Sequence, residues 1–191
     1  MIQLSVLLFN DFETLDVFGP VEIFGRLRDH YTVSFYSLNG GVITNQHNVS
    51  INTVSLSGIV NGTDLFLIPG GPGTRAQVDN IDLIELIKTI SQQSTYVLTV
   101  CTGTAILAKT GLIDGLHATS NKRALAWVMS QGPDVKWQPK ARWVIDGKYY
   151  TSSGVSAGMD MSLGFLQDRH GVEFARKVAY QIEYTWSEDK D

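Results

Sequence analysis

The chain has 191 residues, of which 43% are hydrophobic and 18% charged, with 15 lysines and arginines against 19 acidic residues. This length favours a single domain over residues 1–191, and the composition is that of a globular chain that buries a core. A formal net charge of −4 gives no general attraction to nucleic acid or to anionic lipid. Length, composition and charge therefore exclude a globally disordered chain and a general nucleic-acid binder.

Cysteine and histidine usage narrows the chemistry further. The single cysteine, Cys101, rules out an intrachain disulfide, a CxxC redox pair and a multi-cysteine zinc site. The four histidines lack the spacing of a transition-metal site, so we expect no bound metal. No apolar run approaches the roughly 18 residues that cross a bilayer, and the first residues lack the basic segment of a secretory signal. We expect a cytoplasmic protein with a reduced thiol.

The first part of the chain predicts two strands separated by a helix. Residues 2–9 form a near-continuous apolar run, typical of a central strand covered on both faces. Apolar side chains then follow a helical spacing over 14–27, and we expect Pro20 to open the main helix at its first turn. Residues 32–38 are β-branched and aromatic and predict a second strand, whereas the alternation over 42–56 predicts a small hairpin or a sheet edge.

Two buried strands in the middle of the chain end in segments that can carry chemistry. A strand predicted over 65–68 runs into Pro-Gly-Gly-Pro-Gly at 69–73, where missing side chains let a ligand approach the backbone. A second strand, over 96–100, leads directly to Cys101. Because parallel strands bind ligands at their carboxyl ends, both segments are expected at one edge of the sheet.

The remaining pattern completes an α/β alternation. A short strand is expected at 118, and a hairpin with an Asp-Gly turn over 143–150. Helices are predicted over 81–90, 105–108, 122–129, 157–170 and 172–184. Strands that alternate with helices along most of the chain predict a three-layer α/β domain with a mostly parallel sheet.

Cys101 is the strongest candidate for chemistry. It lies at a predicted strand-to-helix junction, followed by the small residues Thr102 and Gly103, which is the general form of a nucleophile elbow. At that position we expect the helix macrodipole to lower the pKa of the thiol and to raise the thiolate fraction at neutral pH. The alternative is a small buried apolar side chain, which is the usual role of a lone cysteine.

Two further groups are candidate partners of this thiol. The N–H groups of Gly70 and Gly71, with that of Thr102, are expected to form an anion-binding pocket, although plain loop glycines are the alternative. Asp16 lies between two apolar residues, and burial there would raise its pKa and suit it to proton shuttling. Its alternative role is a helix N-cap or first-turn acid.

Four segments together resemble the DJ-1/PfpI superfamily, and they cover nearly the whole chain in the expected order. They read LLFNDFETLDVFGPVEIF, LFLIPGGPG, VLTVCTGTAILAKTGLIDG and SGVSAGMDMSL. Within the superfamily they look most like the isonitrile hydratase-like branch and the similar domain of AraC-type regulators. The resemblance implies a flavodoxin-like sandwich, usually a homodimer, with a nucleophile elbow and no cofactor.

The resemblance also implies a role for each candidate residue. Cys101 would be the nucleophile, Asp16 its carboxyl partner, Thr102 a hydrogen-bonding neighbour, and Gly70 and Gly71 the amide donors. In this branch the thiolate attacks the terminal carbon of an isocyanide to give a thioimidate, and water releases an N-substituted formamide. A small-molecule substrate follows, with neither nucleic acid nor membrane as a partner.

Departures from the family pattern leave other functions open. Thr102 stands where the protease and glyoxalase branches carry a histidine, which disfavours those reactions. Asn121 stands where hydratase-like relatives carry a histidine, so the substrate is uncertain. A redox or small-molecule sensor, in which Cys101 is oxidised to a sulfinate held by Asp16, is the alternative from another class. Another cysteine hydrolase or amidase is the alternative within enzymes, and the short segment after Tyr184 leaves no room for a helix-turn-helix domain.

Overall fold

The computed structural model of the chain describes residues 1–59 and 61–190. Its main sheet is built from β1 (Ile2–Leu7), β2 (Tyr31–Ser37), β3 (Gly41–Thr44), β4 (Ser50–Ser55), β5 (Leu65–Ile68), β6 (Tyr96–Val100), β9 (Trp143–Asp146) and β10 (Tyr149–Ser152). Over the residues described, the eight strands lie in the order β3-β4-β2-β1-β5-β6-β10-β9. The strand predicted from the first apolar run is thus central, with β2 and β5 paired to its two edges.

The interior of the sheet is parallel and its two edges are antiparallel. Strands β4, β2, β1, β5, β6 and β10 run in one direction, whereas β3 and β9 pair antiparallel with β4 and β10. Every residue of β5 is buried, as its unbroken apolar sequence requires of a strand covered on both faces. This arrangement confirms the predicted flavodoxin-like, mostly parallel α/β class and the hairpin expected at the sheet edge.

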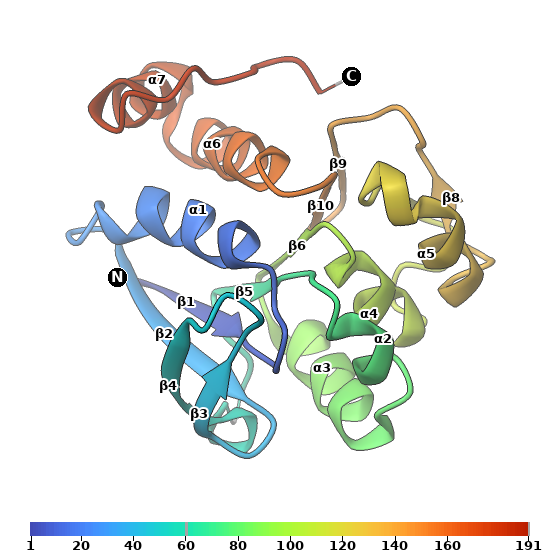
Figure 1. Ribbon diagram of the computed structural model, residues 1–191. Helices are drawn as coiled ribbons and strands as arrows, with labels where there is room; N and C mark the ends of the chain where they lie inside the picture. The colour runs from blue at the N-terminus through green and yellow to red at the C-terminus, as the bar shows by residue number, and fades with distance from the viewer. Residues whose placement is uncertain (60, 191) are drawn as a thin grey trace.

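Helices cover both faces of the sheet, as Figure 1 shows. The helices are α1 (Thr14–Gly25), α2 (Thr74–Gln77), α3 (Ile81–Gln93), α4 (Gly103–Lys109), α5 (Leu125–Gln131), α6 (Ala157–His170) and α7 (Val172–Gln181). Helix α6 packs against both α1 and α7 on one face, and α4 contacts α2, α3 and α5 on the other. Over residues 1–59 and 61–190, no helix combines the length and the apolar character needed to cross a membrane.

Local predictions failed at three places. Pro20 does not open a helix but lies inside α1, which already begins at Thr14. A proline inside a helix removes one backbone hydrogen bond, and burial of the α1 side chains Val17, Ile23 and Phe24 against the core outweighs that loss. The sequence also did not predict the single turn α2 or the strand β8 (Lys136–Trp137), which pairs with β7 (His117–Ala118).

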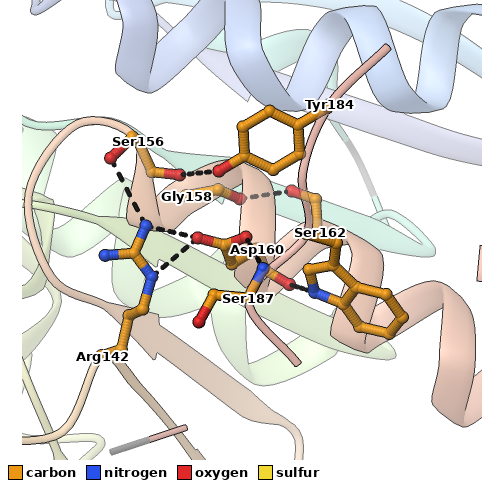
Figure 2. Close-up of polar contacts among 8 residues, drawn as sticks. Arg142, Ser156, Gly158, Asp160, Ser162, Tyr184 and Ser187 are labelled. Carbon is orange, nitrogen blue, oxygen red and sulfur yellow. Dashed lines mark hydrogen bonds and ion pairs between the residues drawn. The ribbon is translucent and has the colours of Figure 1, made fainter. Parts of the chain in front are cut away.

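The last residues of the described chain are held against α6 by a buried carboxylate (Figure 2). Asp160 is fully buried and accepts hydrogen bonds from the Arg142 guanidinium, with Nε at 2.7 Å, and from the backbone N–H of Ser187 at 2.9 Å. The indole of Trp186 donates to the carbonyl of Asp160 at 3.2 Å, and the Arg142 N–H donates to the carbonyl of Lys190 at 2.6 Å. This cluster ties the C-terminal segment to α6 and to the strand that precedes β10.

Candidate active site

Four neighbouring parallel strands end at one edge of the sheet and bring the candidate residues together. Strand β1 leads into α1 with Asp16, β5 into the loop with Gly70 and Gly71, β6 into Cys101, and β10 into the turn with Val155. The carboxyl ends of parallel strands are where open α/β sheets bind ligands. The topology therefore gathers segments from across the chain into one site.

Cys101 occupies a strained elbow between β6 and α4. Its φ of 58° lies in the left-handed region, which costs a non-glycine residue about 1–2 kcal/mol. The backbone around it is fixed, because its N–H is shared between the carbonyls of Ser152 at 3.2 Å and Ser153 at 3.1 Å, and the Ser120 hydroxyl donates to its carbonyl at 2.6 Å. Only 6% of Cys101 is exposed. The predicted elbow is present, and the thiol is enclosed.

Asp16 is buried beside this thiol. Its Oδ2 accepts the N–H of Gly70 at 2.9 Å, whereas Oδ1 has no hydrogen-bond partner of ordinary geometry within the part of the chain that is described. Burial and the charge of Glu13 raise the pKa of Asp16 to about 7, although Gly70, the Cys101 thiol and the Val155 amide oppose the rise. Asp16 is the first-turn acid of α1, as the alternative role expects, and it lies beside the thiol, so its role in proton transfer stays a prediction.

The expected low pKa of Cys101 is wrong. Burial and the adjacent charge of Asp16 raise the pKa of the thiol to about 12, although the N–H of Thr102 and the side chain of Asn121 stabilise the thiolate. A helix of seven residues supplies the macrodipole here, and this favourable field is smaller than the cost of burying a second charge next to a carboxylate. The pair therefore resists carrying two negative charges.

The glycine amides bind the protein rather than remaining free. The N–H of Gly70 is donated to Asp16, and that of Gly71 is donated to Thr102 Oγ1 at 3.1 Å. The Thr74 hydroxyl also donates to Thr102 Oγ1 at 3.1 Å. Gly70 has no room for a side chain, because a Cβ there would lie 2.6 Å from Thr102 N and 2.8 Å from Asp16 Oδ2. The two expected substrate donors instead position the catalytic candidates.

A cavity of about 610 Å³ opens above the thiol, and its lining contains residues that the sequence did not single out. Glu13, Arg75 and Arg123 contribute charged side chains, and Val155 contributes part of one wall. Little in the sequence indicated these residues, because each lies in a polar stretch of the kind found on any protein surface. Only their positions after β1, β5 and β7 place them near the site. Among the residues described, no three His, Cys, Asp or Glu side chains form a group able to hold a metal ion.

Asn121 faces Cys101 with its amide nitrogen. Its Oδ1 accepts the N–H groups of Arg123 at 2.9 Å and Ala124 at 3.3 Å, which leaves Nδ2 to donate toward the sulfur. The residue expected to mark a departure from hydratase-like relatives thus lines the same cavity as the candidate nucleophile and lowers the pKa of its thiol. None of the four histidines lines the cavity.

Comparisons with known proteins identify the family of the chain. The isonitrile hydratase of Pseudomonas putida is 29% identical over 96% of this chain and 78% of its own length. The HTH-type transcriptional regulator CdhR of Pseudomonas aeruginosa is 26% identical over 85% of this chain, which spans 48% of the regulator. The crystal structure of a ThiJ/PfpI family protein from Pseudomonas syringae superposes with a TM-score of 0.84 at 24% identity, over 97% of this chain and 76% of the other. A profile of the DJ-1/PfpI family matches residues 3–168. Sequence and fold agree, and the chain belongs to the DJ-1/PfpI family.

Proposed function

We propose that residues 1–191 form one domain, acting as a homodimer, that hydrates an isocyanide to an N-substituted formamide, with Cys101 as nucleophile and Asp16 as proton carrier. The observation that carries this proposal is the burial of Asp16 and Cys101 next to each other, which raises the pKa of the carboxyl to about 7 and that of the thiol to about 12. An ionised Asp16 beside a neutral thiol is a general base next to a nucleophile.

The proposed reaction begins with transfer of the thiol proton to Asp16 as the sulfur attacks the terminal carbon of the isocyanide. An S–C bond forms, and Asp16 returns the proton to that carbon, which gives the thioimidate R–N=CH–S–Cys101. Water then adds to the same carbon, and Asp16 moves one of its protons to the imine nitrogen. The C–S bond breaks as the remaining hydroxyl proton passes to the sulfur, and the products are R–NH–CHO and the free thiol. The balance is one isocyanide and one water for one formamide.

The surroundings of Cys101 suit the charge that moves in this reaction. The N–H of Thr102 and Nδ2 of Asn121 both stabilise negative charge on the sulfur. Thr102 in turn receives hydrogen bonds from Gly71 and Thr74, which hold its position. The carboxyl and the thiol keep one negative charge between them over the range from about pH 7 to about pH 12.

The test is incubation of the purified protein with an aryl isocyanide while formamide release is followed by chromatography. We expect turnover by the wild type and none by Cys101→Ala or Asp16→Asn. Glu22→Gln is the matched control, because Glu22 is an exposed carboxyl on the same helix, paired with Arg26. Full activity of Cys101→Ala, or no turnover by the wild type, contradicts the proposal.

A sensing role is the second candidate, and one observation favours it. The unpartnered Oδ1 of Asp16, protonated in part near pH 7, is able to donate a hydrogen bond to an oxidised Cys101. Intact mass after mild peroxide treatment tests this role. Selective gain of two oxygen atoms at Cys101 in the absence of isocyanide turnover supports sensing, and an unchanged mass rejects it.

A further inference from the structure

Two arginines share the lining of the active-site cavity with Cys101. Arg75 lies in the turn α2, directly after the loop that follows β5, and Arg123 lies in the short 3₁₀ turn η2 (Lys122–Ala124). The ion pairs found among the described residues include neither guanidinium. Their charges therefore face the cavity without a carboxylate partner from residues 1–59 or 61–190.

Arg75 is held in place by an aromatic ring. Its Cζ lies 3.4 Å from the ring centroid of Trp127, and its Nη1 donates to the Thr74 hydroxyl at 3.3 Å. Stacking leaves the N–H groups at the edge of the guanidinium plane available for a ligand, and it removes part of the entropy cost of ordering the side chain. Thr74 also bonds Thr102, so the arginine is coupled to the nucleophile's neighbour.

The electrostatic link between Arg75 and the thiol is direct. Burial lowers the pKa of the Arg75 guanidinium, and the negative charge of the Cys101 thiolate raises it. Arg123 lines the same cavity, and its backbone N–H donates to Oδ1 of Asn121, the residue whose side chain acts on the Cys101 thiol. Glu13 is the carboxylate that lines the cavity with them. With the one negative charge that Asp16 and Cys101 share, the two cations are balanced, so the attraction for an anion is local to the two guanidinium groups.

We propose that Arg75 and Arg123 form a carboxylate-binding subsite, so that the substrate is an electrophile that carries a carboxylate beyond its reacting carbon. The planar fork of a guanidinium matches a carboxylate in two parallel hydrogen bonds, and an edge-on approach to the stacked Arg75 leaves this geometry free. For the reaction, the inference rests on the proposed hydratase function and specifies an isocyano carboxylate, with the isocyano carbon at Cys101.

The first test reads the subsite without any turnover. Iodoacetate and iodoacetamide both alkylate a thiolate by forming an S–C bond and releasing iodide, but only iodoacetate carries a carboxylate. Both second-order rate constants are proportional to the fraction of Cys101 that is thiolate, so this fraction drops out of their ratio. The ratio therefore measures the preference of the site for an anion. Glutathione under the same conditions gives the reference ratio, and mass spectrometry confirms that Cys101 is the residue modified.

We expect a wild-type ratio above that of glutathione. We expect Arg75→Gln and Arg123→Gln each to lower it about two- to fivefold, the range of a partly exposed charge pair, and Glu13→Gln to raise it. Added salt should reduce the wild-type preference. Arg28→Gln is the matched control, because Arg28 lies between α1 and β2, at the opposite edge of the sheet. Thermal unfolding of each variant confirms that it is folded.

The second test compares turnover of 4-isocyanobenzoate with that of its methyl ester. A lower KM for the anion, lost in Arg75→Gln, supports the subsite in the reaction. The subsite is contradicted if both compounds are turned over with equal kcat/KM and the alkylation ratio equals that of glutathione. In that case the proposed hydratase function is still supported. If neither compound is turned over, the hydratase function fails, and the alkylation ratio still decides the subsite on its own.

Discussion

The backbone N–H of Gly70 donates to Oδ2 of Asp16 over 2.9 Å, and Oδ1 of the same buried carboxyl has no hydrogen-bond partner among the described residues. One N–H offsets only part of the cost of burying a carboxylate. The part of the desolvation cost that is not offset raises the pKa of Asp16. The carboxyl can therefore accept a proton near neutral pH, and its ionised form destabilises the fold.

Asp16→Asn is expected to stabilise the fold above pH 7. The pKa of Asp16 rises from 3.8 to about 7 on folding, so its contribution to stability is present in full below about pH 4 and is lost as the pH rises through about 7. The wild type should lose on the order of 3 to 4 kcal/mol relative to the variant between pH 3 and pH 8. Urea unfolding of both proteins at the two pH values measures this difference, and an equal pH dependence contradicts it.

The same substitution should make Cys101 more reactive, although we expect it to abolish the proposed turnover. Removing the charge of Asp16 removes one of the two causes that raise the pKa of the thiol. We expect Asp16→Asn to be alkylated by iodoacetamide several times faster than the wild type at pH 7.5, and the wild type to react more slowly than glutathione. Glu22→Gln should react like the wild type. A wild-type rate above that of glutathione would falsify the raised pKa.

The architecture was predictable because its signals are local. Largely apolar runs identified β1, β5 and β6, and the segment after β6 identified the elbow at Cys101. The isolated turn α2 escaped prediction, because four residues are too few to show a helical period. The prediction that Pro20 opens the helix was wrong because the burial of α1 in the core overrides the strong local preference of proline for a helix start.

The electrostatics of the site were not predictable from spacing. The position of Cys101 before a helix was visible in the sequence, but the depth of its burial and its contact with Asp16 depend on how β1 and β6 are placed in the sheet. These two quantities reverse the direction of the expected pKa shift. The stacking of Arg75 on Trp127 is likewise a contact between segments that no local pattern reports.

Substitutions of Asn121 should separate its two roles. Asn121→Ala removes both the donor to Cys101 and the acceptor for the N–H groups of η2, so we expect slower alkylation and a loss of about 1 kcal/mol of stability. Asn121→Asp keeps the acceptor but loses the donor, so we expect slower alkylation with stability retained. Iodoacetamide kinetics and thermal unfolding measure the two effects. Alkylation at the wild-type rate in both variants would show that Nδ2 does not act on the thiol.

The ion pair at the C-terminal segment, between the buried Asp160 and the partly exposed Arg142, should be sensitive to the loss of one partner (Figure 2). Arg142→Met leaves the fully buried Asp160 without its cation, which costs about 3 to 5 kcal/mol. Arg142→Met combined with Asp160→Asn should recover most of that loss, because no uncompensated charge is left. Urea unfolding of the single and double variants gives the comparison. If the double variant is as unstable as Arg142→Met, the lost stability comes from the packing of the Arg142 side chain and not from the unpaired charge of Asp160.

Backbone strain at the elbow should be measurable in catalytically dead proteins. Cys101→Ala keeps a Cβ at a φ of 58°, whereas Cys101→Gly removes it. We expect the glycine variant to be more stable than the alanine variant by about 1 kcal/mol, the reverse of the usual order in regular structure. Thermal unfolding of the two variants at one pH tests this, and a more stable alanine variant would show that the elbow carries no strain.

The hydrogen bonds from the Cys101 N–H to the carbonyls of Ser152 and Ser153 also set an order of events during synthesis. The half of the elbow that contains the cysteine leaves the ribosome well before β10, which must pair with β6 to fix that backbone. Until then the thiol belongs to an incomplete sheet and lacks both the Val155 turn and the C-terminal segment that closes over α6. A nascent chain therefore carries Cys101 as an ordinary cysteine, and the pKa of its thiol is shifted only when the last parallel strand has joined the sheet.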